Sequence, residues 1–307
     1  MKKTPFVIFP IFFLFFVFIY DAYTDSVYND ENTSKNKDSI HFKYKFNPGD
    51  TLVYNVVSYD SIVINFDAPL MKKRYEIIEV ICDSVSKKGT FYLRHKLIDF
   101  QGFESKNEEK NTERSFTPWL NRSIQLEIDS VGRRYSYKVL DTVGAGMSPG
   151  GAYQPYLFFP FDETSKVIGE SWIVQSLDDL PENGIPIALL RYSSLFRAFP
   201  QIDTLGELCN RLEYIKTGQG NIVVNSEDGI VKVASVINSF GILDISVEKM
   251  IPIHYYCSIE QKLTITVDED EKYPGSHFIT SFFTLADFKK APIIIKPIPT
   301  KKKINKK

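Results

Sequence analysis

The sequence predicts an all-β protein, mainly antiparallel, with about a dozen or more strands and one or two short helices. Hydrophobic residues make up 43% of the chain and include 24 Phe and 17 Tyr, which is enough for a substantial core. Stretches rich in β-branched and aromatic residues alternate with turns of Gly, Pro, Asn and Asp. No strand–helix–strand pattern is visible, and strands joined by short turns favour antiparallel pairing. We therefore expect one large curved sheet or two packed β halves.

The N-terminal residues 1–20 have the composition of a targeting segment. Lys2 and Lys3 form a positive region, and residues 5–20 contain no charged side chain. This length is typical of a signal peptide and short for a membrane span. No A-x-A cleavage pattern follows, so an uncleaved anchor is the alternative, with membrane contact through residues 5–20. In both cases we expect the rest of the chain outside the cytoplasm, in the periplasm or cell envelope or secreted.

Three further segments are expected. Residues 21–40 are polar without periodicity and form a tether. Residues 41–290 form the β-rich domain, in two halves of about 41–150 and 155–290. Residues 291–307 are a basic tail rich in Lys. The formal net charge of −1 provides no overall attraction for nucleic acid, so we expect no such partner.

In the first half, predicted strands are separated by short turns. His41–Phe46 alternates apolar and charged residues, as a half-buried strand does. Asn47–Asp50, Ser84–Gly89 and Asp129–Gly132 have the residue types of turns. Residues 100–118 are polar with mixed charge and are predicted to be a loop. The other predicted strands are residues 51–58, 61–66, 73–82, 90–98, 123–129 and 133–140.

The stretch 155–174 joins the two halves. Its prolines exclude a regular helix and restrict any strand to edges and ends. Its aromatic residues are too many to leave in water, so we expect the stretch to cross or close a core. These aromatic residues are Tyr156, Phe158, Phe159, Phe161 and Trp172.

In the second half, residues 187–199 are the one helix candidate. Ala188, Tyr192 and Leu195 are spaced three and four apart, and Pro200 would end a helix there. A turn is predicted at Asn238–Gly241. The predicted strands are residues 208–216, 221–225, 230–237, 242–248, 253–267 and 278–285.

Two short patterns recur between the halves. Gly49–Val53 resembles Gly169–Ile173, and Asp129–Gly132 resembles Asn238–Gly241. An internal duplication would explain both recurrences, and so would shared turn chemistry alone.

One catalytic motif occurs, at Gly146–Gly150, where G-x-S-x-G matches the nucleophile elbow of α/β-hydrolases. The elbow needs a strand that leads into a helix, and a second glycine, Ala, Tyr, Gln and Pro follow instead. The residue after the serine must also provide an oxyanion-hole N–H, and Pro149 has none. A hydrolase acting through Ser148 is therefore the least favoured alternative, and we assign no catalytic residue.

No metal site and no cofactor are predicted. The acidic run 268–271 lacks the ligand spacing of a Ca²⁺ loop. The histidines are scattered, and the cysteines show no C-x-x-C or zinc-type spacing. We expect the cysteines to be small buried hydrophobes, with one disulfide as the alternative. The residues concerned are His41, His95, His254, His277, Cys82, Cys209 and Cys257.

Several short motifs resemble a family of exported bacterial β-proteins known mainly as domains of unknown function. The motifs are Phe46-x-x-Gly49-Asp50-Thr51-x-x-Tyr54, Phe159-Pro160-Phe161 and Gly169-Glu170-Ser171-Trp172, followed by a glycine-containing hairpin. The resemblance covers roughly residues 42–266. It implies an extracytoplasmic antiparallel fold akin to the lipoprotein-carrier half-barrel, whose curved sheet can shelter an apolar ligand. Many members have a lipid-anchored cysteine, and this chain has none at the equivalent place.

The function favoured by these observations is a non-catalytic extracytoplasmic binding or carrier protein of the cell envelope. Its partner would be an apolar ligand or an envelope protein. The surplus of aromatic residues without a catalytic constellation motivates this hypothesis. Tyr156, Phe158, Phe159 and Trp172 are the candidate ligand-binding residues on the concave face of the sheet. The alternative is a structural or assembly protein that acts through protein–protein contacts at an exposed apolar patch.

Overall fold

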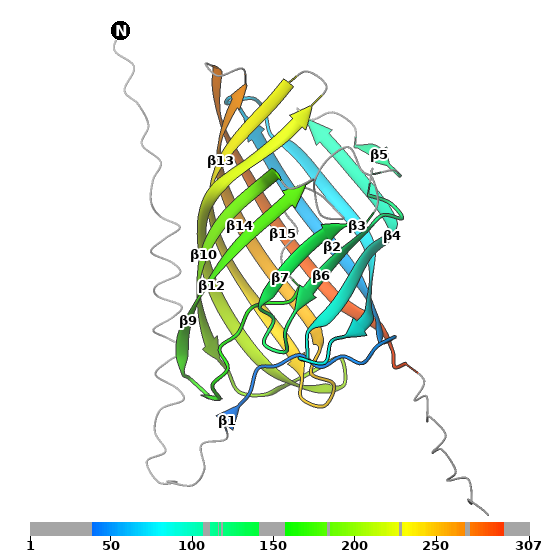
Figure 1. Cartoon of the computed structure of the whole chain (residues 1–307). Helices are drawn as coiled ribbons and strands as arrows, with labels where there is room; N and C mark the ends of the chain where they lie inside the picture. Colours follow the sequence, from blue (N-terminus) through cyan, green and yellow to red (C-terminus); the bar gives the residue numbers. More distant parts are fainter. Residues whose placement is uncertain are drawn as a thin grey trace, which may run out of the picture. The chain divides into compact units, whose positions relative to one another are not determined.

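The computed structural model describes residues 39–106, 111–115, 117, 119–140, 157–182, 185–226, 229–267 and 271–291. All described residues belong to one compact unit, Ser39–Lys307. Every regular element in the described ranges is a β-strand (Figure 1). This confirms the predicted all-β, antiparallel fold class, while the one or two short helices are not found among these residues. Within the same ranges no helix is long and apolar enough to span a membrane.

The strands differ widely in length. They are β1 (Ser39–Ile40), β2 (Thr51–Ile64), β3 (Leu70–Val85), β4 (Phe91–Lys106), β5 (Thr112–Arg114), β6 (Ser123–Ile128), β7 (Arg134–Val139), β8 (Lys166–Val167), β9 (Ser171–Glu182), β10 (Ile185–Ala198), β11 (Ile202–Thr204), β12 (Glu207–Ser226), β13 (Gly229–Ser246), β14 (Pro252–Val267) and β15 (Glu271–Lys289).

One antiparallel sheet of 13 strands contains all of them except β1 and β8, which pair with each other. Its order is β7-β6-β4-β3-β2-β15-β14-β13-β12-β10-β9, with β5 paired to β4 and β11 paired to β12. Because β2 pairs with β15, strands from both halves of the chain share this sheet. Figure 1 shows the sheet strongly curved. The two end strands, β7 and β9, come near each other without pairing, so the sheet is not closed.

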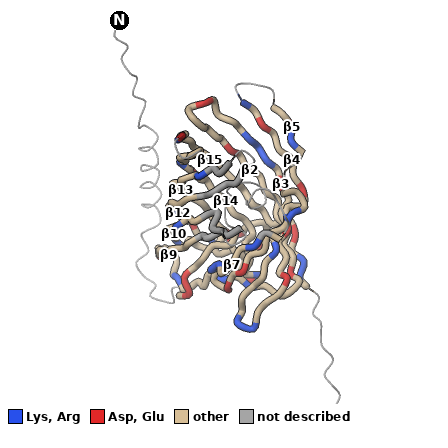
Figure 2. Tube along the Cα trace, turned by 45° about the horizontal axis from the view of Figure 1, so that its top comes forward, with Lys and Arg blue, Asp and Glu red and all other residues tan. Residues whose placement is uncertain are grey.

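The two faces of the sheet differ, as the strand period of two requires. On β2 the side chains of Leu52, Tyr54 and Val56 are buried. Tyr59, at an odd-numbered position of the same strand, points to the opposite face and is exposed. We call the face that carries Leu52, Tyr54 and Val56 the inner face and the opposite one the outer face. Charged residues of both signs are interspersed along the strands and turns (Figure 2).

An aromatic core lies against one part of the inner face. Phe158, Phe159 and Phe161 are buried, which agrees with the expectation that the stretch 155–174 crosses a core. Tyr44 packs edge-on against Phe158, and its hydroxyl accepts a hydrogen bond of 2.9 Å from the backbone N–H of Phe159. This bond ties the segment before β2 to the joining stretch. Residue Tyr156 lies outside the described residues.

The predicted helix over residues 187–199 is wrong, because this stretch is strand β10. Leu190, Tyr192 and Phe196 are buried at even spacing, while Leu195, which a helical stripe would bury, is exposed. Strand β10 pairs with β9 on one side and β12 on the other. Because β10 pairs on both edges, its backbone N–H and C=O groups are hydrogen-bonded to neighbouring strands. This pairing decides the structure, since the spacing of its apolar residues is compatible with a helix or a strand.

Several strands are longer than predicted. The predicted turn Asn238–Gly241 is wrong, since these residues lie inside β13. A Cβ on Gly241 would lie 2.4 Å from a ring atom of Tyr214, so this glycine allows a close approach rather than a turn. Residues 100–106, predicted as part of a loop, continue β4 because they pair with the start of β3.

The two recurring glycine segments form the same turn. Gly49 and Gly169 both have positive φ, 90° and 84°. The N–H of Gly49 donates to the carbonyl of Cys82 in β3, and that of Gly169 to the carbonyl of Ala198 in β10. In each case the acceptor lies near the end of the strand that pairs with the one following the turn. The acidic residue that follows, Asp50 or Glu170, accepts a backbone N–H three residues earlier with its carboxylate. This equivalence extends the sequence similarity to structure, and a true duplication stays a prediction.

Candidate ligand-binding site

Beyond the aromatic core, the inner face becomes polar. Along β2 the inward positions change from Tyr54 and Val56 to Ser58 and Asp60, all buried. The neighbouring strands continue this change, because Ser58 is opposite Arg74 of β3 and Ser281 of β15. The hydroxyls of Ser58 and Ser281 are hydrogen-bonded at 2.8 Å. Side chains distant in the sequence therefore meet on one face through strand pairing alone.

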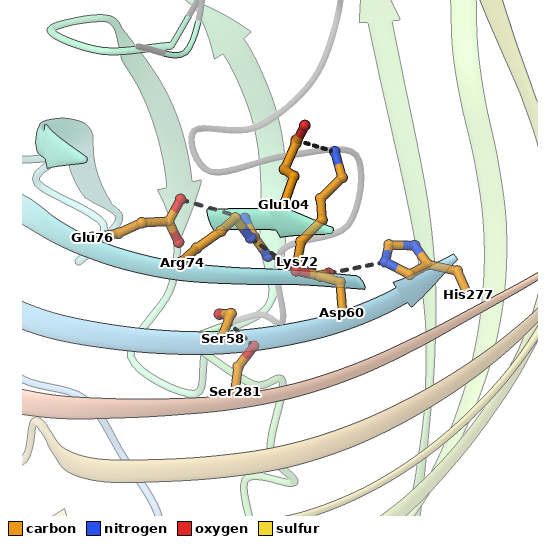
Figure 3. Close-up of polar contacts among 8 residues, drawn as sticks. All are labelled: Ser58, Asp60, Lys72, Arg74, Glu76, Glu104, His277 and Ser281. Atoms are coloured by element: carbon orange, nitrogen blue, oxygen red, sulfur yellow. Dashed lines mark hydrogen bonds and ion pairs between the residues drawn. The ribbon is translucent and has the colours of Figure 1, made fainter. Parts of the chain in front are cut away.

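Four charged or titratable side chains of β2, β3 and β15 meet on this face, and we call them the buried charge cluster (Figure 3). They are Asp60, Arg74, Glu76 and His277. Arg74 donates from Nε to Asp60 Oδ2 at 3.0 Å and from Nη1 to Glu76 Oε1 at 3.4 Å. His277 Nε2 donates to Asp60 Oδ1 at 2.9 Å. The side chains of Glu76 and Asp60 are only 0% and 4% exposed, so this is an ion network taken out of water.

The environment of the cluster shifts the pKa of its acids in opposite directions. Burial raises the pKa of Asp60, but the hydrogen bond from His277 and the charge of Arg74 outweigh it and hold that pKa below its usual value. Burial also raises the pKa of Glu76, and here Arg74 opposes the effect without overcoming it. Glu76 is thus the carboxyl whose negative charge is least well compensated.

One atom of the cluster lacks a hydrogen bond. Glu76 Oε2 is fully buried and receives no hydrogen bond from the described residues. The second oxygen of the same carboxyl is occupied by Arg74. Leaving a buried acceptor unpaired costs roughly 1–3 kcal/mol, more for a charged group, so native proteins rarely do so without a reason.

A second polar group occupies the inner face of β12, β13 and β14. The amide of Gln261 donates to the hydroxyl of Ser235 at 2.7 Å. The hydroxyls of Tyr214 and Tyr255 are 2.6 Å apart, and Tyr214 also meets Ser239 at 3.2 Å. Of these three strands, β14 is the neighbour of β15, which carries His277, so polar positions continue from the buried charge cluster across the sheet.

The predicted binding residues Phe158, Phe159 and Trp172 are all buried in the aromatic core. Phe159 contacts the rings of Phe196, Tyr214 and Tyr255, and Trp172 stacks on Phe196. Their packing partners are therefore protein rings. The role of these three residues and of Tyr156 in ligand binding stays a prediction.

Sequence reasoning missed the buried charge cluster. A signal was present, because Tyr54, Val56, Ser58 and Asp60 follow the period of one strand face and change from apolar to polar. The strand predicted over residues 51–58 ended before Asp60, and this hid the continuity. The partnership with Arg74 and His277 had no local signal, since it depends on which strands become neighbours.

The other chemical motifs of the sequence add no site to the described part. Gly146–Gly150 and residues 268–270 lie outside the described residues. Within the described ranges, no group of three His, Cys, Asp or Glu side chains is close enough to hold a metal ion. The three cysteines are buried and free, as expected for small hydrophobes.

No protein family profile matches this chain. No curated protein sequence matches it either. Among solved structures, the chain is similar to one described as "Lipid-protein interactions in lipovitellin", with 11% identity and a TM-score of 0.45. The match covers 82% of this chain and 26% of that chain. A similarity this low does not establish a shared fold or function.

Proposed function

We propose that this chain is a non-catalytic binding or carrier protein whose ligand lies against the inner face of the sheet. The observation that supports this most is the buried charge cluster. A sheet that needed only stability would continue the apolar positions of Leu52, Tyr54 and Val56. Instead Asp60 and Glu76 occupy the equivalent places further along β2 and β3.

The energetics of buried charge support a role in binding. Removing an ion pair from water costs several kcal/mol for each ion, and apolar residues of similar volume are often as stabilising or more so. Arg74 and its two acids are therefore a poor choice for stability alone. A polar surface held rigid by strand pairing is well suited to orient a ligand.

The proposed ligand is amphipathic. The inner face combines buried rings with a buried polar surface, which matches a molecule that has an apolar part and a polar end. We further propose that the protein acts outside the cytoplasm, on the basis of the charge-free residues 5–20 behind Lys2 and Lys3.

Native mass spectrometry of the full chain, purified without detergent from the cells that make it, tests the proposal. We expect an extra mass that denaturation releases. The double variant Asp60→Asn, Glu76→Gln should lose this mass, whereas Asp83→Asn, which changes an exposed ion pair with Arg94, should keep it. A ligand-free mass for the wild type in every oligomeric state would overturn the proposal.

A second candidate, a structural or assembly protein, is favoured by the outer face. An apolar stripe crosses neighbouring strands there: Ile173 is opposite Leu195, Leu195 opposite Ile215, and Ile215 opposite Phe240. All four side chains are exposed, Ile173 by 65%. Sedimentation velocity should then show an assembly of the wild type that Ile215→Lys dissociates. A wild type that stays monomeric across the accessible concentration range would exclude self-assembly through this stripe.

A further inference from the structure

The charges of the buried charge cluster do not balance. Asp60 and Glu76 contribute two carboxyls, and Arg74 contributes one permanent positive charge. His277 adds a positive charge only when it is protonated, and its Nε2 is already used by Asp60. With both acids ionised and His277 neutral, the cluster lacks one positive charge.

The position of the missing charge is marked by Glu76 Oε2. This oxygen is fully buried, and no described residue donates a hydrogen bond to it. Arg74 already donates to the other oxygen of Glu76 and to Asp60, so its guanidinium is shared between two acids. Oε2 is thus an acceptor that no described residue fills and that an N–H of a bound molecule can fill.

We propose that the ligand carries a cationic N–H group, an ammonium or a guanidinium, and that this group donates to Glu76 Oε2. This inference rests on the proposed function, because it assigns the polar end of the ligand on the inner face. An anionic end would add a third negative charge beside Asp60 and Glu76. A neutral hydroxyl would complete the hydrogen bond and leave the charge uncompensated.

Other cations fit the site less well. Within the described residues, no three metal-ligating side chains are close enough to share an ion, and Asp60 is already occupied by Arg74 and His277. An N–H cation needs only one acceptor in a direct line, and a hydrogen bond between charged groups is about twice as strong as a neutral one.

The proposal also predicts a pH dependence. Because burial raises the pKa of Glu76, the free protein holds this carboxyl more readily in its protonated form. A bound cation favours the ionised form, so binding releases a proton and tightens as the pH rises. Arg74 and Asp60 are the other charged groups that face Glu76.

Calorimetric titration of the full chain with two probes of equal chain length, octylammonium and 1-octanol, tests the inference. We expect octylammonium to bind at least about tenfold more tightly than 1-octanol, as a charged hydrogen bond predicts. Glu76→Gln should abolish this preference. The matched control Glu79→Gln, on the outer side of the same strand, should retain it.

The outcomes separate this inference from the proposed function. Equal affinity for the two probes in the wild type would overturn the cationic group and leave a binding protein in place. A preference that persists in folded Glu76→Gln would overturn the assignment to Glu76. If this variant does not fold, the pH dependence of octylammonium binding to the wild type tests the proposal instead. An affinity that does not rise between about pH 5 and about pH 8 would contradict it. Binding of neither probe would overturn the inference, and a ligand-free native mass would then remove the proposed function as well.

Discussion

Replacing Arg74 by leucine is the sharpest test of how the inner face is built. The substitution removes the permanent positive charge shared by Asp60 and Glu76, whose side chains are 4% and 0% exposed. Two carboxyls would remain out of water without their cation. Breaking a buried pair in this way costs about 3–5 kcal/mol of unfolding free energy.

Arg94→Leu is the matched control. Arg94 forms hydrogen bonds of 3.0 and 3.2 Å to Asp83, much like those of Arg74, but the two side chains are 34% and 31% exposed. Exposed ion pairs contribute only about 0.2–1 kcal/mol. The two Arg→Leu substitutions, on adjacent strands, should therefore lower the unfolding free energy by amounts that differ severalfold, because the Arg74 ion pairs are buried and the Arg94 pair is exposed.

The loss at Arg74 should also depend on pH. In the wild type, the pKa of Asp60 is lowered on folding, so its contribution is present above the unfolded pKa and is lost as the pH falls through the folded pKa. In the variant, burial without Arg74 raises the pKa of both acids, so the folded state binds protons and loses stability as the pH rises. The difference between wild type and variant should therefore grow from about pH 4.5 to about pH 8.

Urea unfolding followed by the fluorescence of the buried Trp119 and Trp172 measures these differences. Equal losses for Arg74→Leu and Arg94→Leu would refute the reasoning from burial. A loss at Arg74 that does not change with pH would refute the assignment of the effect to the two carboxyls.

Three further results are expected. Gly132→Ala should destabilise far more than Gly89→Ala in urea unfolding, because both glycines have positive φ but only a Cβ at Gly132 would meet a backbone oxygen, at 2.0 Å. Similar losses would contradict the close contact. Tyr44→Phe should cost about 1–3 kcal/mol, since it leaves the buried N–H of Phe159 without its acceptor; an unchanged urea midpoint would argue against that bond. The three cysteines should resist a thiol reagent until the protein unfolds, because burial raises the pKa of these thiols to about 11 or 12; rapid labelling of the native chain would show that they are accessible.

The sequence by itself determined the fold class and many of the turns. Alternation of apolar and polar residues and the turn residues at Asn47–Asp50 and Asp129–Gly132 are local signals, and short-range sterics decide them. The buried rings of the stretch 155–174 were also predictable, because aromatic surface of that size is rarely left in water. These features depend on residues that are neighbours along the chain.

Only the tertiary structure decided the rest. Residues 187–199 suit a helix or a strand locally, and pairing with β9 and β12 made them a strand. The residue types around Gly241 indicate a turn, and only the folded chain places the ring of Tyr214 against this glycine. The joining of both halves into one sheet depends on the pairing of β2 with β15, which are far apart in the sequence. The buried charge cluster has the same origin, because Asp60, Arg74 and His277 become neighbours only when three strands align, and no local pattern encodes which strands those are.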